Sequence, residues 1–458
     1  MNIKIDPSKL PAPQSGIVLI IILTVIVIGA AGVFMATANY KQRQVTVTNS
    51  SHGNLDQIKR AILGWALSHP NKPGMLPWPD SRSDSNYDGN SDCLANTPTY
   101  TNLLGRVPWL GQTSPCVAPL TGMSVRSIDA TGAPVYYAAS PNLVYNYNSG
   151  SYPTINSSTR DLSTGWLTVI DRRGNVLSNR VAFVVIAPGR ALNSQQRNGT
   201  TPATDQYLDS VMVNGTLYNN ANSNGVFVSG QPDDSFNDLI QYVTIDQLMV
   251  LVEKRVLREL KSCLDSYAAT NGGTYPYPIN MNGETGSNNT SSSNDDASDD
   301  ASDDASDDAS DDANDDANDD ASDDASDDGS SSVVTTNLFG RFNKSLTWPT
   351  ACMVNENYFN DWQDTSFYMV APGFISGGNK TCATCLQLNG SGNYHAMVLL
   401  AGPTLGSQTR AFSSDQKLIL NYLEGLNLNP YDYLFQSGSK TLTFNDKVMC
   451  VDGNQSCK

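Results

Sequence analysis

The sequence predicts an α+β fold: a long N-terminal apolar helix, then two tandem heads that each combine a helix with a β-sheet, with an Asp-rich repeat inserted in the second. Three observations carry this prediction. Residues 17–38 form one mostly apolar run, and beyond it a set of short motifs occurs twice in the same order. Each set of motifs follows a stretch with helical apolar spacing and contains several short β-type runs.

The apolar run at 17–38 contains 22 uncharged residues. A helix of this length can cross the roughly 30 Å hydrocarbon core of a membrane, and it is apolar on all sides, unlike the amphipathic helices of soluble cores. The run therefore predicts a membrane-inserted helix. Its small residues either allow close approach between helices or are merely tolerated in a single anchor.

The residues before this run give it a family resemblance. A polar leader, 1–16, ends at Gly16, and a long apolar helix and a polar remainder follow. This arrangement resembles type IV pilins and pseudopilins. The resemblance implies that a prepilin peptidase cuts between Gly16 and Ile17, that the helix first anchors the chain in the inner membrane, and that it later packs into a filament core. Major pilins mostly carry Glu where this chain has Ile21, which points toward a minor subunit.

The part beyond the apolar helix repeats itself. Residues 181–197 and 395–410 both read as an apolar strand, a Gly/Pro turn and a Leu-x-Ser-Gln-x-Arg motif. Three further pairs of segments match in the same order: 74–79 with 273–278, 102–106 with 337–341, and 135–141 with 366–372. The first copy also resembles a group of pilin-like proteins of Gram-negative bacteria, which implies that each copy is a pilin-like head with an antiparallel sheet.

Each copy begins with a predicted amphipathic helix. The apolar stripes consist of Leu55, Ile58, Ile62 and Leu63 in the first copy, and of Leu248, Leu251, Val252, Val256, Leu260 and Leu264 in the second. Pro70 stops the first helix, and Gly272 and Gly273 end the second. The resulting domain boundaries are 1–16 for the leader, 17–70 for the N-terminal helix, 71–240 for the first head, 241–293 for the second helix and loop, 294–328 for the repeat tract, and 329–458 for the second head.

Net charge and histidine content exclude several classes of function. The chain of 458 residues has a net charge of −17, and residues 294–328 hold 18 Asp. Subtracting these from the 45 acidic residues leaves 27, against 28 basic ones, so no basic footprint for nucleic acid remains. Three His and no Gly-x-Ser-x-Gly, His-Glu-x-x-His or P-loop motif predict that the protein is not an enzyme. A monotopic surface enzyme is the most distant alternative.

An even number of cysteines in an exported chain predicts disulfide bonds. Spacing favours pairing Cys93 with Cys116, Cys382 with Cys385, and Cys450 with Cys457, which leaves Cys263 with Cys352. The Cys-Ala-Thr-Cys pair is alternatively a redox motif, but no βαβ pattern surrounds it.

An acidic loop in the first copy predicts a calcium site. Its candidate ligands alternate around a turn that Gly89 permits: Asp80, Asp84, Asn86, Asp88 and Asp92. Calcium takes six to eight oxygen ligands. The loop resembles the first nine positions of an EF-hand, but Ala95 stands where the bidentate Glu belongs. The alternative is an Asx-turn loop that holds no metal.

The repeat tract at 294–328 lies in the second copy, between the equivalents of the two motifs that flank the acidic loop in the first copy. We therefore interpret the tract as that loop expanded by repetition. Its candidate calcium ligands are Asp295, Asp296, Asp299, Asp300, Asp303, Asp304, Asp307, Asp308, Asp311, Asp312, Asp315, Asp316, Asp319, Asp320, Asp323, Asp324, Asp327 and Asp328. The tract either holds a regular row of calcium ions between neighbouring subunits or is a solvated spacer.

Together these features predict a structural subunit of an extracellular type IV pilus-like filament, stabilised by calcium at its Asp-rich loops. The expected partners are other copies of the chain, which join through the N-terminal helix. Before assembly the chain is expected to contact the inner membrane, the prepilin peptidase and the pilus assembly machinery. No nucleic acid is expected as a partner. The alternative is a minor pilin or pseudopilin that initiates a pilus or secretion apparatus, or acts as its adhesin.

Overall fold

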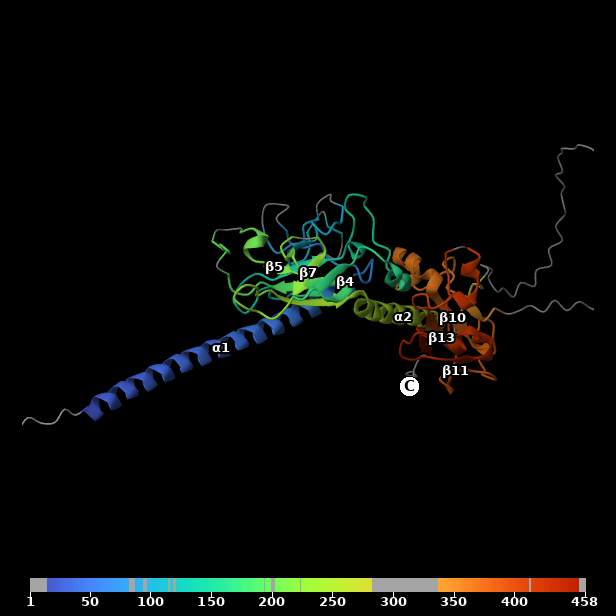
Figure 1. Ribbon diagram of the computed structural model, residues 1–458. Coiled ribbons are helices and arrows are strands. Elements are labelled where there is room, and N and C mark those ends of the chain that lie inside the picture. The colour runs from blue at the N-terminus through green and yellow to red at the C-terminus, as the bar shows by residue number, and fades with distance from the viewer. Residues whose placement is uncertain are drawn as a thin grey trace, which may run out of the picture.

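The computed structural model describes residues 15–81, 87–93, 97–113, 116–117, 121–192, 194–198, 202–222, 224–281, 337–411 and 413–452. In the N-terminal helix the described side chains are those of residues 22–31, 33–35, 42 and 45–68. Figure 1 shows an elongated molecule in which one helix extends from a β-rich unit, and a second helix leads from that unit into another.

Helix α1 (Ser15–Ser68) is continuous over 54 residues. Its last turns pack on the first sheet because Leu55, Ile58 and Ile62 recur at intervals of three and four residues and are fully buried. The helix ends just before Pro70, since proline disfavours the helical conformation in the residue that precedes it. The N-terminal part extends away from the β-rich unit (Figure 1).

The predicted fold class, with its membrane-length N-terminal helix, is wrong for the described part of the chain. Among the residues and side chains that the structure describes, no helix is both long enough and apolar enough to cross a membrane. The expectation of a transmembrane helix is corrected accordingly.

The prediction of two pilin-like heads with purely antiparallel sheets is also wrong. Strand β3 pairs with β7 in parallel, and β11 pairs with β14 in parallel. The reason is that segments of low sequence regularity between the repeated motifs add strands that the motifs did not indicate. A pilin fold is therefore not what the described residues form.

The first sheet has the order β1-β2-β4-β3-β7, and β8 pairs with β4 beside β3. Its strands are β1 Leu104–Arg106, β2 Tyr136–Ala139, β3 Leu167–Asp171, β4 Val176–Ala187, β7 Val226–Ser229 and β8 Leu239–Thr244. Along β4, Phe183 and Val185 contact the helix side of the core, and Val184 and Ile186 contact the opposite cluster. Both faces of the sheet are therefore buried, which explains the continuous apolar run in β4.

Helix α2 (Ile245–Thr270) begins directly where β8 ends. Thr244 is both the last residue of β8 and the N-cap of α2, and it forms a capping box with Gln247. Gly272 and Gly273, with φ of +63° and +86°, follow the helix, and both angles lie in the region that glycine adopts without strain. Of the predicted stripe, Leu251 is partly exposed and the other members are buried.

The second sheet repeats the core of the first. Its order is β15-β13-β10-β9, all antiparallel, with the bounds β9 Phe339–Arg341, β10 Ser366–Val370, β13 Ala396–Leu400 and β15 Lys447–Val451. In chain order, the first sheet joins β1, β2, β4 and β8 in the same succession. The motif pairs in the sequence thus occupy equivalent strands: Leu104–Arg106 corresponds to Phe339–Arg341.

Two small sheets complete the strands of the described ranges. One joins β12 (Ser391–Tyr394), β11 (Leu386–Leu388) and β14 (Leu434–Phe435). The other is the hairpin of β5 (Ser210–Val213) and β6 (Thr216–Asn219), in which Asn214 and Gly215 both have positive φ. An Asn-Gly pair is the preferred connection of such a two-residue turn.

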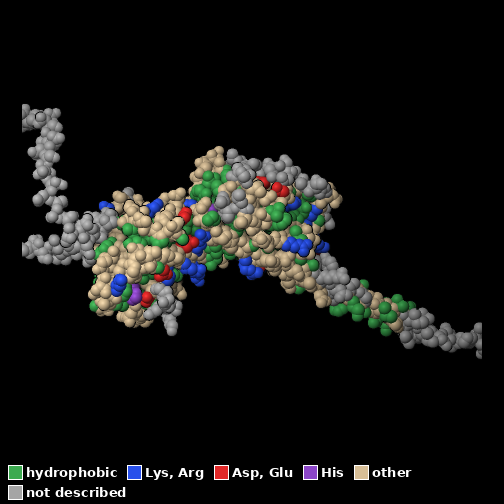
Figure 2. All heavy atoms as spheres, turned by 180° about the vertical axis from the view of Figure 1, so that it is seen from behind, with side chains coloured by type: hydrophobic (Ala, Val, Ile, Leu, Met, Phe, Trp, Pro, Cys, Tyr) green, Lys and Arg blue, Asp and Glu red, His purple; other side chains and the backbone are tan. Residues whose placement is uncertain are grey.

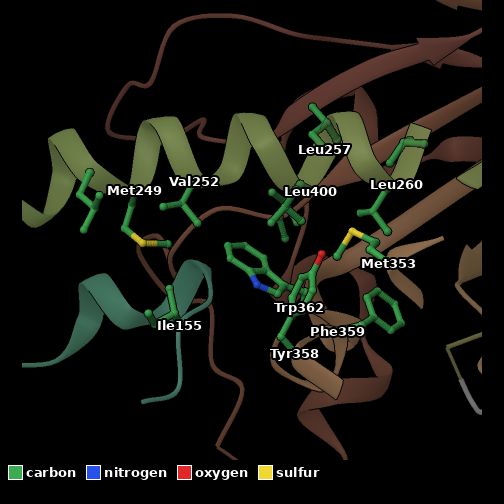
Figure 3. Close-up of a cluster of buried hydrophobic side chains, with 14 of the residues drawn as sticks. Ile155, Met249, Val252, Leu257, Leu260, Met353, Tyr358, Phe359, Trp362 and Leu400 are labelled. Carbon is green, nitrogen blue, oxygen red and sulfur yellow. The ribbon is translucent and has the colours of Figure 1, made fainter. Parts of the chain in front are cut away.

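One hydrophobic core runs through both copies. The same cluster of buried residues extends from Leu55 in α1 to Val451 in β15. Figure 3 shows how α2 joins the two parts: Val252 projects from α2 toward Ile155 of the first copy and Trp362 of the second, and Leu260 projects toward Met353 of the second. The two copies therefore pack as one body around α2.

Candidate functional sites

The acidic loop of the first copy is anchored at the edge of the first sheet. Asp80 forms an antiparallel bridge with Arg106, and its backbone N–H donates to the Arg106 carbonyl at 3.0 Å. The side chains of Asp80 and Asp92 are buried, at 2% and 7% exposure. Two of the predicted ligands, Asp84 and Asn86, lie outside the described residues.

The carboxylates of the loop accept hydrogen bonds from its own backbone. The Gly89 N–H donates to Asp80 Oδ2 at 2.9 Å. The backbone N–H and the hydroxyl of Ser81 donate to Asp92 Oδ2 at 2.6 and 2.7 Å, and the Asn90 N–H donates to Asp88 Oδ1 at 2.8 Å. The Asp88 contact is an Asx-turn. The Asp80 and Asp92 contacts join residues nine and eleven positions apart, and so connect the two ends of the loop.

Gly89 is required in this loop for two reasons. Its φ is +88°, which other residues adopt only with strain. A Cβ atom at this position would lie 2.6 Å from the indole nitrogen of Trp109. The glycine thus lets the loop turn sharply against the Trp109 ring.

Asp80 retains one buried oxygen that the loop does not use. Its Oδ1 is buried and has no hydrogen-bond partner within the described residues. The pKa of Asp80 is raised to about 7, chiefly by burial and in smaller part by the charges of Asp92 and Asp88, while the Gly89 N–H and Arg106 oppose the shift. A buried carboxylate oxygen without a donor is unfavourable, and it is the kind of hard oxygen that calcium binds.

The described residues supply only part of a calcium coordination shell. Within the described ranges, no three His, Cys, Asp or Glu side chains lie close enough together to hold a metal ion. Asp80 Oδ1 fits calcium by its chemistry, and Asp88 and Asp92 bring further carboxylates to the same loop. All 18 Asp of the tract 294–328 lie outside the described residues.

Disulfide bonds join the loops and the helix. The structure contains the bridges Cys93–Cys116, Cys263–Cys352 and Cys382–Cys385. The first connects the end of the acidic loop to the segment that follows β1, and the second fixes α2 to η5 (Met353–Asn355). Cys450 is disulfide-bonded as well, and its expected partner Cys457 lies outside the described residues. Gly16 and Ile17, the predicted processing site, lie in the first turn of α1.

Sequence reasoning missed a buried polar network that occurs once in each copy. It starts at the Gln of the Leu-x-Ser-Gln-x-Arg motif. Gln195 Nε2 donates to Asp209 Oδ1 at 2.8 Å, and Gln408 Nε2 donates to Glu424 Oε1 at 2.8 Å. The same motif residue therefore reaches an acidic residue in both copies.

The arginine of the motif has matching contacts too. Arg197 and Arg410 each donate through Nη1 to the glycine carbonyl of the preceding Gly/Pro turn, at 2.7 and 3.1 Å. Their guanidinium carbons lie 4.8 Å from the centre of the Tyr207 ring and 4.5 Å from that of the Tyr422 ring. Such cation–π contacts are stabilising when partly buried. The motif is thus a structural clamp that ties a strand end to the loop after it.

A second acidic residue completes each network. In the first copy, Asp238 Oδ2 accepts from the Asp209 backbone N–H at 2.8 Å and from Asn220 Nδ2 at 2.9 Å. The equivalent bonds in the second copy run to Asp446 Oδ2 from the Glu424 N–H at 2.8 Å and from Asn427 Nδ2 at 3.0 Å. Two buried carboxyl groups therefore face each other in each copy.

These pairs favour the protonated form of one carboxyl group. Burial raises the pKa of Asp238 well above its ordinary value, and the charge of Asp209 raises it further. Burial likewise raises the pKa of Asp446, with Glu424 adding to the shift. The Oδ1 atoms of Asp238 and Asp446 are both buried without a hydrogen-bond partner in the described part of the chain. A proton on one carboxyl of each pair reduces the repulsion between them.

The sequence held a signal for this network. Each motif is followed by a Phe-Asn-Asp triplet, at 236–238 in one copy and at 444–446 in the other. The triplet supplies the second acidic residue, but only the structure reveals that the loop between motif and triplet folds back to bring them together.

Comparisons with protein-family models, with curated proteins and with solved structures found no match to this chain.

Proposed function

We propose that this protein is a structural subunit of an extracellular filament, that its copies assemble through α1, and that calcium at the Asp80 loop stabilises its first copy. The observation that carries the proposal is the exposed apolar part of α1. Large apolar side chains there are half or more exposed: Ile22 52%, Leu23 63%, Val25 64%, Ile26 60%, Val27 58% and Ile28 66%. Figure 2 displays this part of the helix as an apolar extension of the molecule.

The arrangement of these side chains favours several neighbours over one. Successive residues of a helix point about 100° apart, so residues 25–28 alone are apolar on every side. A single groove would cover only one side. A bundle of identical helices covers all sides, and each copy of the chain supplies one. Each side chain buried in such a bundle contributes about 1.5–3 kcal/mol.

The disulfide bonds support a location outside the cytoplasm. Disulfides form in oxidising compartments, and the described part of this chain contains three complete ones. The cleavage between Gly16 and Ile17 stays a prediction.

Filament formation is tested by electron microscopy of surface material and of purified chain. Ile26→Asp is expected to abolish filaments, because it places a charge inside the helix bundle. Gln42→Asp, at an exposed position of the same helix, is the matched control and should assemble normally. Filaments of normal abundance from Ile26→Asp would contradict the proposal, as would insertion of the wild-type chain into lipid vesicles without assembly.

Calcium binding is tested by thermal unfolding with calcium and with EGTA. At 100 times its dissociation constant, calcium should stabilise the wild-type chain by about 2.7 kcal/mol. Asp80→Asn should reduce this gain because it removes a carboxylate from the loop, whereas Asp234→Asn, at a side chain that is 91% exposed, should retain it. Equal gains in Asp80→Asn and wild type would sink the assignment of the site to this loop.

A minor subunit at the tip of a filament is the second candidate, and the cleft described next favours it, because a tip protein needs a site for an outside ligand. The two candidates differ in abundance. A main subunit dominates sheared filaments, whereas a tip protein is a trace component on filaments of another protein.

A further inference from the structure

A cleft of about 370 Å³ lies where the two copies meet. Asn71, Lys72 and Tyr152 of the first copy line one wall, and Glu356, Asn357 and Tyr358 of the second copy line the other. Its volume lies at the lower end of the range of about 300–1,000 Å³ that is usual for ligand sites. Neither copy alone forms this cleft.

Lys72 and Tyr358, the buried side chains at the base of the two walls, form the floor of the cleft and are held in place by contacts within the protein. Lys72 Nζ lies 2.6 Å from Asp361 Oδ2, and the Ile155 backbone N–H donates to the same oxygen at 3.0 Å. The Tyr358 hydroxyl donates to Glu259 Oε2 of α2 at 2.6 Å, and Tyr358 lies beneath α2 in Figure 3. The charged and hydroxyl groups of the floor are thus engaged and fixed before any ligand arrives, which lowers the entropic cost of binding.

The rim of the cleft, in contrast, carries polar side chains that are free to bind. Asn71, Glu356 and Asn357 are exposed, and their side chains make no hydrogen bond or ion pair with the described residues. Tyr152 is 39% exposed. Its ring packs edge-on against Tyr145 at 4.8 Å between centres, and Lys72 Nζ lies 5.8 Å from its centre. The Tyr152 ring is therefore fixed by packing on one side and exposed to solvent on the other.

We propose that this cleft binds one or two rings of a neutral saccharide. An exposed aromatic ring offers a flat apolar surface, which suits the C–H face of a sugar. Two amides and a carboxylate on the two walls supply both donors and acceptors, and the hydroxyl groups of a sugar both donate and accept.

The charges of the cleft disfavour other classes of ligand. The Lys72 ammonium is neutralised by Asp361, and the unpaired charge at the rim is the single carboxylate of Glu356. A phosphate, an acidic sugar or an acidic peptide would meet that carboxylate without a free cation to balance it. The polar rim offers little to a purely apolar ligand.

The experiment is saturation-transfer NMR on the full chain with a panel of neutral mono- and disaccharides, an acidic sugar and a short neutral peptide. At least one neutral saccharide should bind to the wild type. Tyr152→Ala and Asn357→Ala should each weaken its binding about tenfold or more, a loss that corresponds to one removed favourable contact. Tyr152→Phe keeps the ring and should stay within a few-fold of wild type.

Tyr431→Ala, which removes a tyrosine that is 49% exposed elsewhere on the second copy, is the matched control and should bind like wild type. Binding that Tyr152→Ala leaves unchanged would overturn the proposal, and so would preference for the acidic sugar or the peptide, or no binding by any neutral saccharide. Thermal unfolding of each variant establishes that it is folded. The readout does not depend on filament formation, so the filament proposal and this one can fail separately.

Discussion

Replacing Glu253 by alanine is expected to lower the free energy of unfolding by about 3–5 kcal/mol, the usual cost of removing one partner of a buried ion pair. Glu253 is 1% exposed. Its Oε1 accepts from Arg160 Nη1 at 2.7 Å, its Oε2 accepts from Arg160 Nη2 at 3.2 Å, and Lys447 Nζ lies 3.0 Å from Oε2. Without Glu253, the Arg160 side chain, 5% exposed, would stay buried with only a longer contact to Asp246.

The effect should reach both copies, because the three partners come from different parts of the fold. Arg160 lies in η3 (Ser157–Asp161) of the first copy, Glu253 in α2, and Lys447 in β15 of the second. Urea unfolding followed by tryptophan fluorescence measures the change, since Trp78 and Trp166 lie in the first copy and Trp348 and Trp362 in the second.

Asp234→Ala is the control for this variant. It removes an exposed ion pair with Arg190, and exposed pairs contribute at most about 1 kcal/mol. A Glu253→Ala protein that unfolds at the wild-type urea concentration would contradict the expectation. Separate transitions for the two copies in the wild type would contradict the single packed body on which it rests.

The second large effect is a loss of stability as the pH rises above the ordinary range of carboxyl groups. Burial raises the pKa of Asp238 and of Asp446 in the folded chain. Between the unfolded pKa, about 4, and the raised folded pKa, the folded state binds more protons than the unfolded state. Stability is therefore fully present below about pH 4 and falls by about 1.4 kcal/mol per pH unit for each such group as the pH rises through this interval.

The charged neighbours of each pair set the size of the effect. Asp238 faces Asp209 and, more weakly, Arg197, which opposes the shift. Asp446 faces Glu424, and the neighbouring Arg410 lies over the Tyr422 ring and interacts with Asp161 as well.

The measurement is the urea unfolding free energy of wild type and of the double variant Asp238→Asn, Asp446→Asn between pH 5 and 8. The wild type should lose stability more steeply than the variant, because asparagine does not titrate. Asp80, whose pKa is about 7, contributes with the same sign in both proteins and cancels from the comparison. Parallel curves for the two proteins would rule out proton uptake by these pairs.

Sequence patterns that act locally anticipated much of this structure. The helical stripe from Leu248 to Leu264 is buried except for Leu251, and the cysteine pairs close in sequence are bonded. These features depend on spacing along a single element or loop, which the sequence states directly.

Features that depend on how distant segments meet were missed. The parallel pairing of β3 with β7 joins residues 168 and 226, and no short sequence motif predicts this pairing. The clamp needs a loop of more than ten residues to bring Gln195 to Asp209, and a further segment to bring Asp238. The predicted membrane-length helix is wrong for another reason: an apolar composition alone does not establish a membrane span, and among the described residues no helix is long and apolar enough to cross a membrane.

The direct junction between β8 and α2 has a mechanical consequence. Thr244 ends the strand and caps the helix, so no slack chain separates the two copies. A pulling force on the second copy is transmitted along α2 into β8, which pairs antiparallel with β4 over Val181–Ala187. The load then acts along the strands, and several hydrogen bonds must break together before the chain can lengthen. In the filament that we propose, such subunits would resist stretching until whole sheets shear, instead of extending through flexible tethers.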